Sequence, residues 1–131
     1  MSFWGNTRSI MVNIEMTAPQ WRIKATVALY PVTCAKNQLA ASLRVNEVTM
    51  LAAADELAAA TRDAKAWFAD NACPDLVLET RVSWMLNTCA EVALTAKLVV
   101  TDSSADTAAA IDRLSDLLAI IDIYSQTLDD W

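Results

Sequence analysis

Apolar residues recur at helical spacing along most of the chain. After Thr17, spacings of alternately four and three residues place one apolar set on a single side of a helix. This set is Trp21, Ala25, Ala28, Val32, Ala35, Leu39 and Ser42, with Arg22, Thr26, Thr33, Lys36, Asn37 and Arg44 on the opposite side. Thr17 and Gln20 match a capping box. Because the apolar phase continues past Pro31, we expect one helix, kinked at Pro31, to about Arg44.

An alternative for the same region is a β-strand. From Trp21 to Tyr30, apolar residues also alternate with polar ones in part, and the earlier segment from Ile10 to Met16 alternates with a period of two. The two segments would then form a hairpin around Thr17–Gln20. The capping box and the phase after Pro31 favour the helix.

Three further helices are predicted downstream. Asn46 is a suitable N-cap for the second, the segment Asp70–Pro74 ends it, and Pro74 is placed at the start of the third. Thr101–Asp106 forms the next polar turn. The predicted inward positions are Val48, Leu51, Ala54, Leu57, Ala58, Thr61, Ala64, Trp67 and Phe68 in the second helix, Leu78, Val82, Met85, Cys89, Val92, Ala96 and Val99 in the third, and Ile111, Leu114, Leu117, Leu118, Ile121, Tyr124 and Leu128 in the fourth.

Four helices of similar length joined by short loops predict an all-α, antiparallel up-down-up-down bundle. We assign residues 17–131 to this single domain. Residues 1–16 form an N-terminal extension that is either strand-like or disordered. The third helix also carries Leu76, Leu86, Leu94 and Leu98 in other directions, so we expect it to be covered on more than one side.

The charges are unevenly distributed. The 131-residue chain has a formal charge of −6. Up to Asn46 there are five basic residues and one acidic residue, and from Glu47 onward there are five basic and 15 acidic residues. An up-down bundle places its first and last helices side by side, so the basic first helix would lie beside an aspartate-rich fourth helix. The acidic total disfavours nucleic acid as a partner.

The cysteines, the N-terminal residues and the most apolar stretch indicate where in the cell we expect the protein. Cys34, Cys73 and Cys89 are an odd number at wide spacing, which signals neither a disulfide framework nor a zinc site. The N-terminal residues lack the apolar core of a secretory signal, so we expect a cytoplasmic protein. The apolar stretch from Leu76 to Val100 contains charged residues, so we expect no membrane span.

The residue types that usually carry chemistry are scarce. Histidine is absent, and the single glycine, Gly5, leaves no glycine-rich phosphate loop, so we expect no cofactor and no metal. Cys73 is the best candidate nucleophile because it precedes a helix N-terminus, which would lower its pKa. A structural role for all three cysteines is the simpler interpretation.

Carboxylates suggest one enzymatic alternative. Glu56, Asp112 and Asp116 have spacings that a magnesium-dependent nucleotide hydrolase could use. The run Asp112–Leu118 is similar to the acidic helix of all-α nucleotide pyrophosphohydrolases, but their paired-glutamate helix has no counterpart, since Leu57 and three alanines follow Asp55–Glu56. A solvated acidic face is the preferred interpretation.

Aromatic residues suggest two other sites. A small hydrophobic ligand would find a pocket near Pro31 lined by Trp21, Tyr30, Trp67 and Trp84. Terminal apolar residues are candidates for an interface with a second subunit or an unidentified protein. These are Trp4, Ile10, Val12, Ile14 and Trp131. With 55% hydrophobic residues, the chain favours a non-enzymatic interaction or regulatory module that self-associates, most simply as a homodimer.

Overall fold

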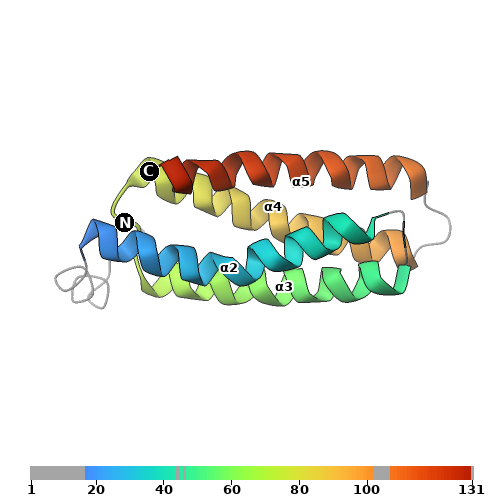
Figure 1. Ribbon diagram of the computed structural model, residues 1–131, viewed down its shortest axis with the longest axis horizontal. Helices are drawn as coiled ribbons and strands as arrows, with labels where there is room; N and C mark the ends of the chain where they lie inside the picture. Colours follow the sequence, from blue (N-terminus) through green and yellow to red (C-terminus); the bar gives the residue numbers. More distant parts are fainter. Residues whose placement is uncertain (1–16, 44, 46, 102–106, 131) are drawn as a thin grey trace.

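The computed structural model describes residues 17–43, 45, 47–101 and 107–130, with side chains up to Gln126. Within these ranges the chain forms four helices and no strand: α2 (Ala18–Ser42), α3 (Glu47–Asp70), α4 (Leu76–Thr101) and α5 (Thr107–Asp130). The predicted antiparallel bundle is therefore confirmed (Figure 1). The predicted N-terminal extension, Asn46 and Trp131 lie outside the described residues.

The start of α2 follows the predicted capping box. The Thr17 side chain accepts a hydrogen bond from the Gln20 amide at 3.3 Å, and the Gln20 side chain accepts one from the Thr17 amide at 3.0 Å. The helix then continues through Pro31 to Ser42, so the strand alternative for Trp21 to Tyr30 is wrong. The local capping signal and the long-range apolar phase outweigh the weaker alternation.

The start of α4 differs from the prediction. The helix begins at Leu76, and Asp75 rather than Pro74 marks its N-terminus. The Asp75 carboxylate accepts a hydrogen bond from the Leu78 amide at 3.1 Å. An acidic side chain at this position satisfies an otherwise unpaired amide and interacts favourably with the helix dipole.

One core runs the length of the bundle, filled mainly by the predicted stripes. The errors lie at the edges of these stripes. Val48 was expected inside and is exposed, whereas Met50 and Ala53, on adjoining positions of α3, are buried. Leu76, Leu94 and Leu98 of α4 are exposed, so within one chain that helix is covered on fewer sides than expected.

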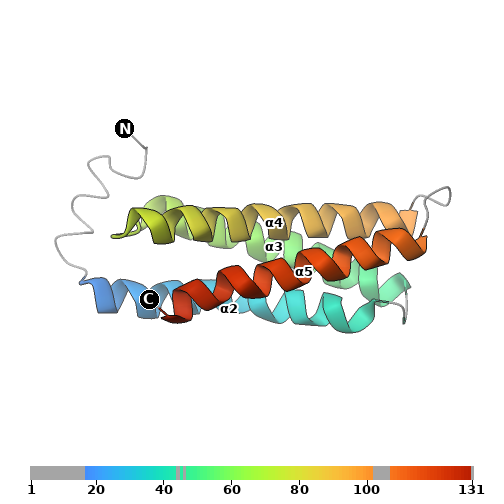
Figure 2. The same ribbon diagram turned by 90° about the horizontal axis from the view of Figure 1, so that it is seen from above.

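The helices do not contact one another equally. Helices adjacent in sequence pack along much of their length, whereas the contact between α2 and α5 is far smaller. Figure 2, viewed from above, shows α5 running obliquely to the other helices. The first and last helices are thus neighbours, as predicted, but they are only partly closed against each other. None of the described helices is long and apolar enough to cross a bilayer.

Candidate functional site

A groove of about 440 Å³ lies where α2 and α5 are incompletely closed. Its base is apolar, formed by residues of α2, α4 and α5, and its sides carry hydroxyl, amide and charged groups. The base residues are Leu29, Val32, Met85 and Ile121, and the polar residues are Thr26, Tyr30, Thr33, Lys36, Asp122, Ser125 and Gln126. We call this the α2–α5 groove.

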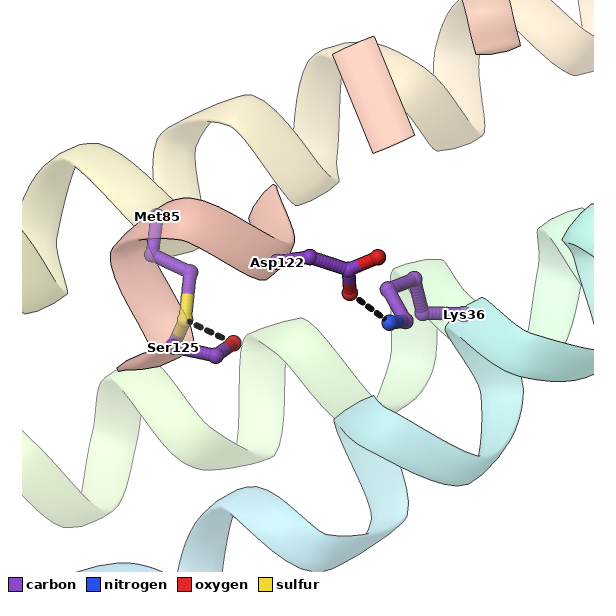
Figure 3. Close-up of polar contacts among 4 residues, drawn as sticks. All are labelled: Lys36, Met85, Asp122 and Ser125. Atoms are coloured by element: carbon purple, nitrogen blue, oxygen red, sulfur yellow. Dashed lines mark hydrogen bonds and ion pairs between the residues drawn. The ribbon is translucent and has the colours of Figure 1, made fainter. Parts of the chain in front are cut away.

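An ion pair crosses the α2–α5 groove. The Lys36 ammonium of α2 contacts the Asp122 carboxylate of α5, as Figure 3 shows. The Lys36 side chain is only 11% exposed, whereas that of Asp122 is 63% exposed. Placing Lys36 on the outer face was therefore wrong. It is four residues after Val32 and three before Leu39, so the helical period itself points it towards the bundle.

A second contact joins α4 and α5 beneath the ion pair. The Ser125 hydroxyl donates to the Met85 sulfur at 3.2 Å (Figure 3). At the outer edge of the α2–α5 groove, a hydrogen bond with Cys34 raises the pKa of the Tyr30 hydroxyl. The α2–α5 groove thus combines an apolar base with donors, acceptors and charges of both signs, a combination suited to a small amphipathic molecule.

The outer face of α2 carries a stripe of large exposed apolar side chains. Ile23, Val27 and Tyr30 follow one another at helical spacing and are 66%, 68% and 67% exposed. Between Ala25 and Ser42 the sole charged residue is Lys36, which is turned inward. We call the stripe Ile23, Val27 and Tyr30 the α2 outer face. The exposed sides of α3, α4 and α5 all carry charged residues, including Glu56, Arg81 and Asp116.

The four aromatic residues proposed for a ligand pocket occupy three places. Trp21 and Trp67 lie together with Phe68 at one end of the bundle, with ring centroids of the two tryptophans 6.1 Å apart. The Trp21 indole donates to the Asn71 carbonyl at 3.1 Å, which fixes this cluster against the α3–α4 connection. Tyr30 borders the α2–α5 groove, and the exposed Trp84 lies beside Tyr124.

The candidate catalytic carboxylates are exposed and come from two helices. Glu56 on α3 and both Asp112 and Asp116 on α5 are exposed. Within the described parts of the chain, no cluster of three or more cysteine or acidic side chains is positioned to hold a metal ion.

The Cys73 thiol differs from the alternative in which it is a reactive nucleophile. Burial raises the pKa of Cys73 to about 11, although the nearby helix N-terminus was expected to lower it. Its sulfur donates to the Asp75 carbonyl at 3.2 Å. Burial also raises the pKa of Cys89 to about 12. Both thiols are therefore protonated at neutral pH, the opposite of what a nucleophile needs.

The proposed interface residues Trp4, Ile10, Val12, Ile14 and Trp131 all lie outside the described residues.

In comparisons with known proteins, no family model matches the sequence, and no curated protein or solved structure is significantly similar to it. Functional inference therefore depends on the surface of the molecule itself.

Proposed function

We propose that this protein is a self-associating interaction module in which two copies dock through the α2 outer face. The observation that carries the proposal is the exposed, uncharged and largely apolar stripe of Ile23, Val27 and Tyr30. Depletion of charge together with exposed aromatic and aliphatic side chains is typical of the centre of a protein interface.

A second copy of this chain is the partner that the charges favour. Each copy carries a net charge of −6, concentrated after Glu47, so most faces of two copies repel each other. Contact through α2 keeps the acidic helices apart. A two-fold axis near Val27 would set the two α2 helices antiparallel, so that each copy presents the same stripe to the other.

Substitution of Val27 tests this arrangement. Val27→Glu puts a charge at the centre of the α2 outer face, and the control Ile123→Glu makes the same change on α5, where the side chain is 67% exposed. We expect the wild type and Ile123→Glu to be dimers at about 100 μM by light scattering, and Val27→Glu to be a monomer. A monomeric wild type, or equal behaviour of the two variants, would disprove the proposal.

The α2–α5 groove supports a second function, the binding of a small amphipathic molecule. Its apolar base would take a hydrocarbon chain, and Lys36 and Asp122 offer charges of either sign to a head group. This function does not need a dimer, because the α2–α5 groove is built within one chain.

Filling the α2–α5 groove tests the second function. Thr26→Trp places a large side chain at its edge, and Thr80→Trp is the matched control, because each threonine is exposed and bonds the carbonyl four residues before it. We expect decanoate or dodecyltrimethylammonium, below micellar concentration, to raise the melting temperature of the wild type and Thr80→Trp but not of Thr26→Trp. No rise with either probe, or an equal rise in Thr26→Trp, would contradict it.

A further inference from the structure

A separate pocket of about 360 Å³ lies on the other side of the molecule's core, between α3 and α4. These two helices pack side by side along the bundle (Figure 1). The floor of the pocket is made of small residues, and its rim carries long basic side chains. The lining residues are Ala58, Thr61, Arg62, Lys65, Ala90, Ala93, Leu94 and Lys97, which we call the α3–α4 pocket.

Positive charge converges on the α3–α4 pocket from both helices. The chain from Glu47 onward contains five basic residues among 15 acidic ones, and three of those five are Arg62, Lys65 and Lys97. Lys97 pairs with Asp55 at 2.9 Å, and both side chains are about half exposed. Among the described residues, Arg62 and Lys65 have no acidic partner within ion-pair distance. A local concentration of cations on an acidic protein is a site for an anion.

Thr61, which lines this pocket, has a buried hydroxyl with no hydrogen-bond partner among the described residues. Thr61 is 2% exposed, and within the described part of the molecule its Oγ1 atom makes no hydrogen bond. A buried polar atom in this condition costs free energy, and native proteins normally satisfy it. Threonine hydroxyls in helices usually bond the carbonyl four residues earlier, as Thr26 and Thr80 do here. A ligand oxygen in the pocket would satisfy this hydroxyl once the buried Oγ1 atom turned towards it.

We propose that the α3–α4 pocket binds a small phosphomonoester with an apolar group. Arg62 presents the planar donor fork that matches phosphate oxygens, while Lys65 and Lys97 contribute point charges. The Thr61 hydroxyl can donate to a third oxygen. Leu94 forms an exposed apolar wall beside these groups and gives the organic part of the ligand a surface to contact. The phosphate competes with Asp55 for Lys97, so binding strengthens where that carboxylate is removed.

Phenyl phosphate is a suitable probe, used with the full chain at constant ionic strength. We expect saturable binding by calorimetry, with amide NMR shifts centred on residues 61–65 and 90–97. Arg62→Gln combined with Lys65→Gln should weaken the affinity about tenfold or more, because two charge-assisted contacts are lost. The control Lys24→Gln with Arg81→Gln removes equal charge from other surfaces and should retain the affinity. Absence of saturable binding, or equal weakening in the control, would overturn the proposal.

Thr61→Val separates a ligand contact from a packing defect. Replacing the unpaired hydroxyl with a methyl group should raise the melting temperature of the free protein and lower its affinity for phenyl phosphate severalfold. Unchanged affinity in this stabilised variant would show that the hydroxyl takes no part in the site. Asp55→Asn should raise the affinity for phenyl phosphate, because it removes the carboxylate that competes for Lys97. A lower affinity in this variant would count against direct competition at Lys97.

Discussion

The thiol of Cys89 lies within the core on α4, where it is removed from water. Burial raises its pKa from the ordinary value of 9.0 to about 12, although the ammonium groups of Lys36 and Lys65 partly oppose this rise. The neutral thiol is the form that the folded protein accommodates. Below the ordinary pKa both the folded and unfolded chains hold the proton, and the thiol therefore contributes its full stabilising effect there.

Stability should fall as alkaline pH ionises this thiol in the unfolded chain first. Between about pH 8 and pH 10 we expect the free energy of unfolding to decrease, and Cys89→Ala to reduce that decrease by about 1 kcal/mol. Urea denaturation under reducing conditions at the two pH values measures the difference. The control Val92→Ala removes a buried, non-titrating side chain from the same helix and should keep the wild-type pH dependence. A Cys89→Ala variant with an unchanged pH dependence would contradict this account.

Single residues also show where sequence reasoning reached its limit. The apolar period identified most of the core, but Lys36 was grouped with the polar residues of the opposite side, where lysine is usually found. The structure instead buries its stem and directs its ammonium to Asp122. Thr61 was placed inward correctly, but the apolar period gives no sign that, among the described residues, its Oγ1 atom makes no hydrogen bond. Whether a buried polar group has a partner can be determined only from the packed structure.

At the scale of the helices, the start of α2 could be predicted because its capping side chains are close together in the sequence. The capping box at Thr17 and Gln20 is contained in four consecutive residues, so the sequence alone predicted it. The outer face of α4 depends on what packs beside it. Leu94 and Leu98 are as apolar as the core leucines, and periodicity does not show whether a neighbour covers them. For the same reason the pocket predicted near Pro31 shares only Tyr30 with the lining of the α2–α5 groove.

The Lys36–Asp122 pair is expected to stabilise the limited contact between α2 and α5. Asp122→Asn leaves the poorly solvated ammonium without its countercharge and should lower the free energy of unfolding by about 1 kcal/mol. Lys36→Met replaces the ammonium with an apolar end over an apolar base, so its cost should be smaller. Asp116→Asn, an exposed change on the same helix, is the control. Urea denaturation ranks the three, and a larger loss for Lys36→Met would refute the assigned role.

For the whole molecule, four amphipathic segments with short connections were sufficient to predict the bundle. The predicted adjacency of the basic first and acidic last helices is also found, with Lys36 and Asp122 as one pair across it. Function was harder to predict from the sequence, because surface sites combine residues from different helices. The α3–α4 pocket takes its cations from positions 62, 65 and 97, which no local motif connects.

The unequal helix contacts also determine how the chain is expected to fold. The three extensive contacts join sequence neighbours, so each requires closure of only a short connection. Contact between α2 and α5 instead brings together segments separated by most of the chain, at a larger entropic cost and with less surface in return. Helices α3 and α4 should therefore dock before α2 meets α5, and the ion pair of Lys36 and Asp122 should form after the transition state.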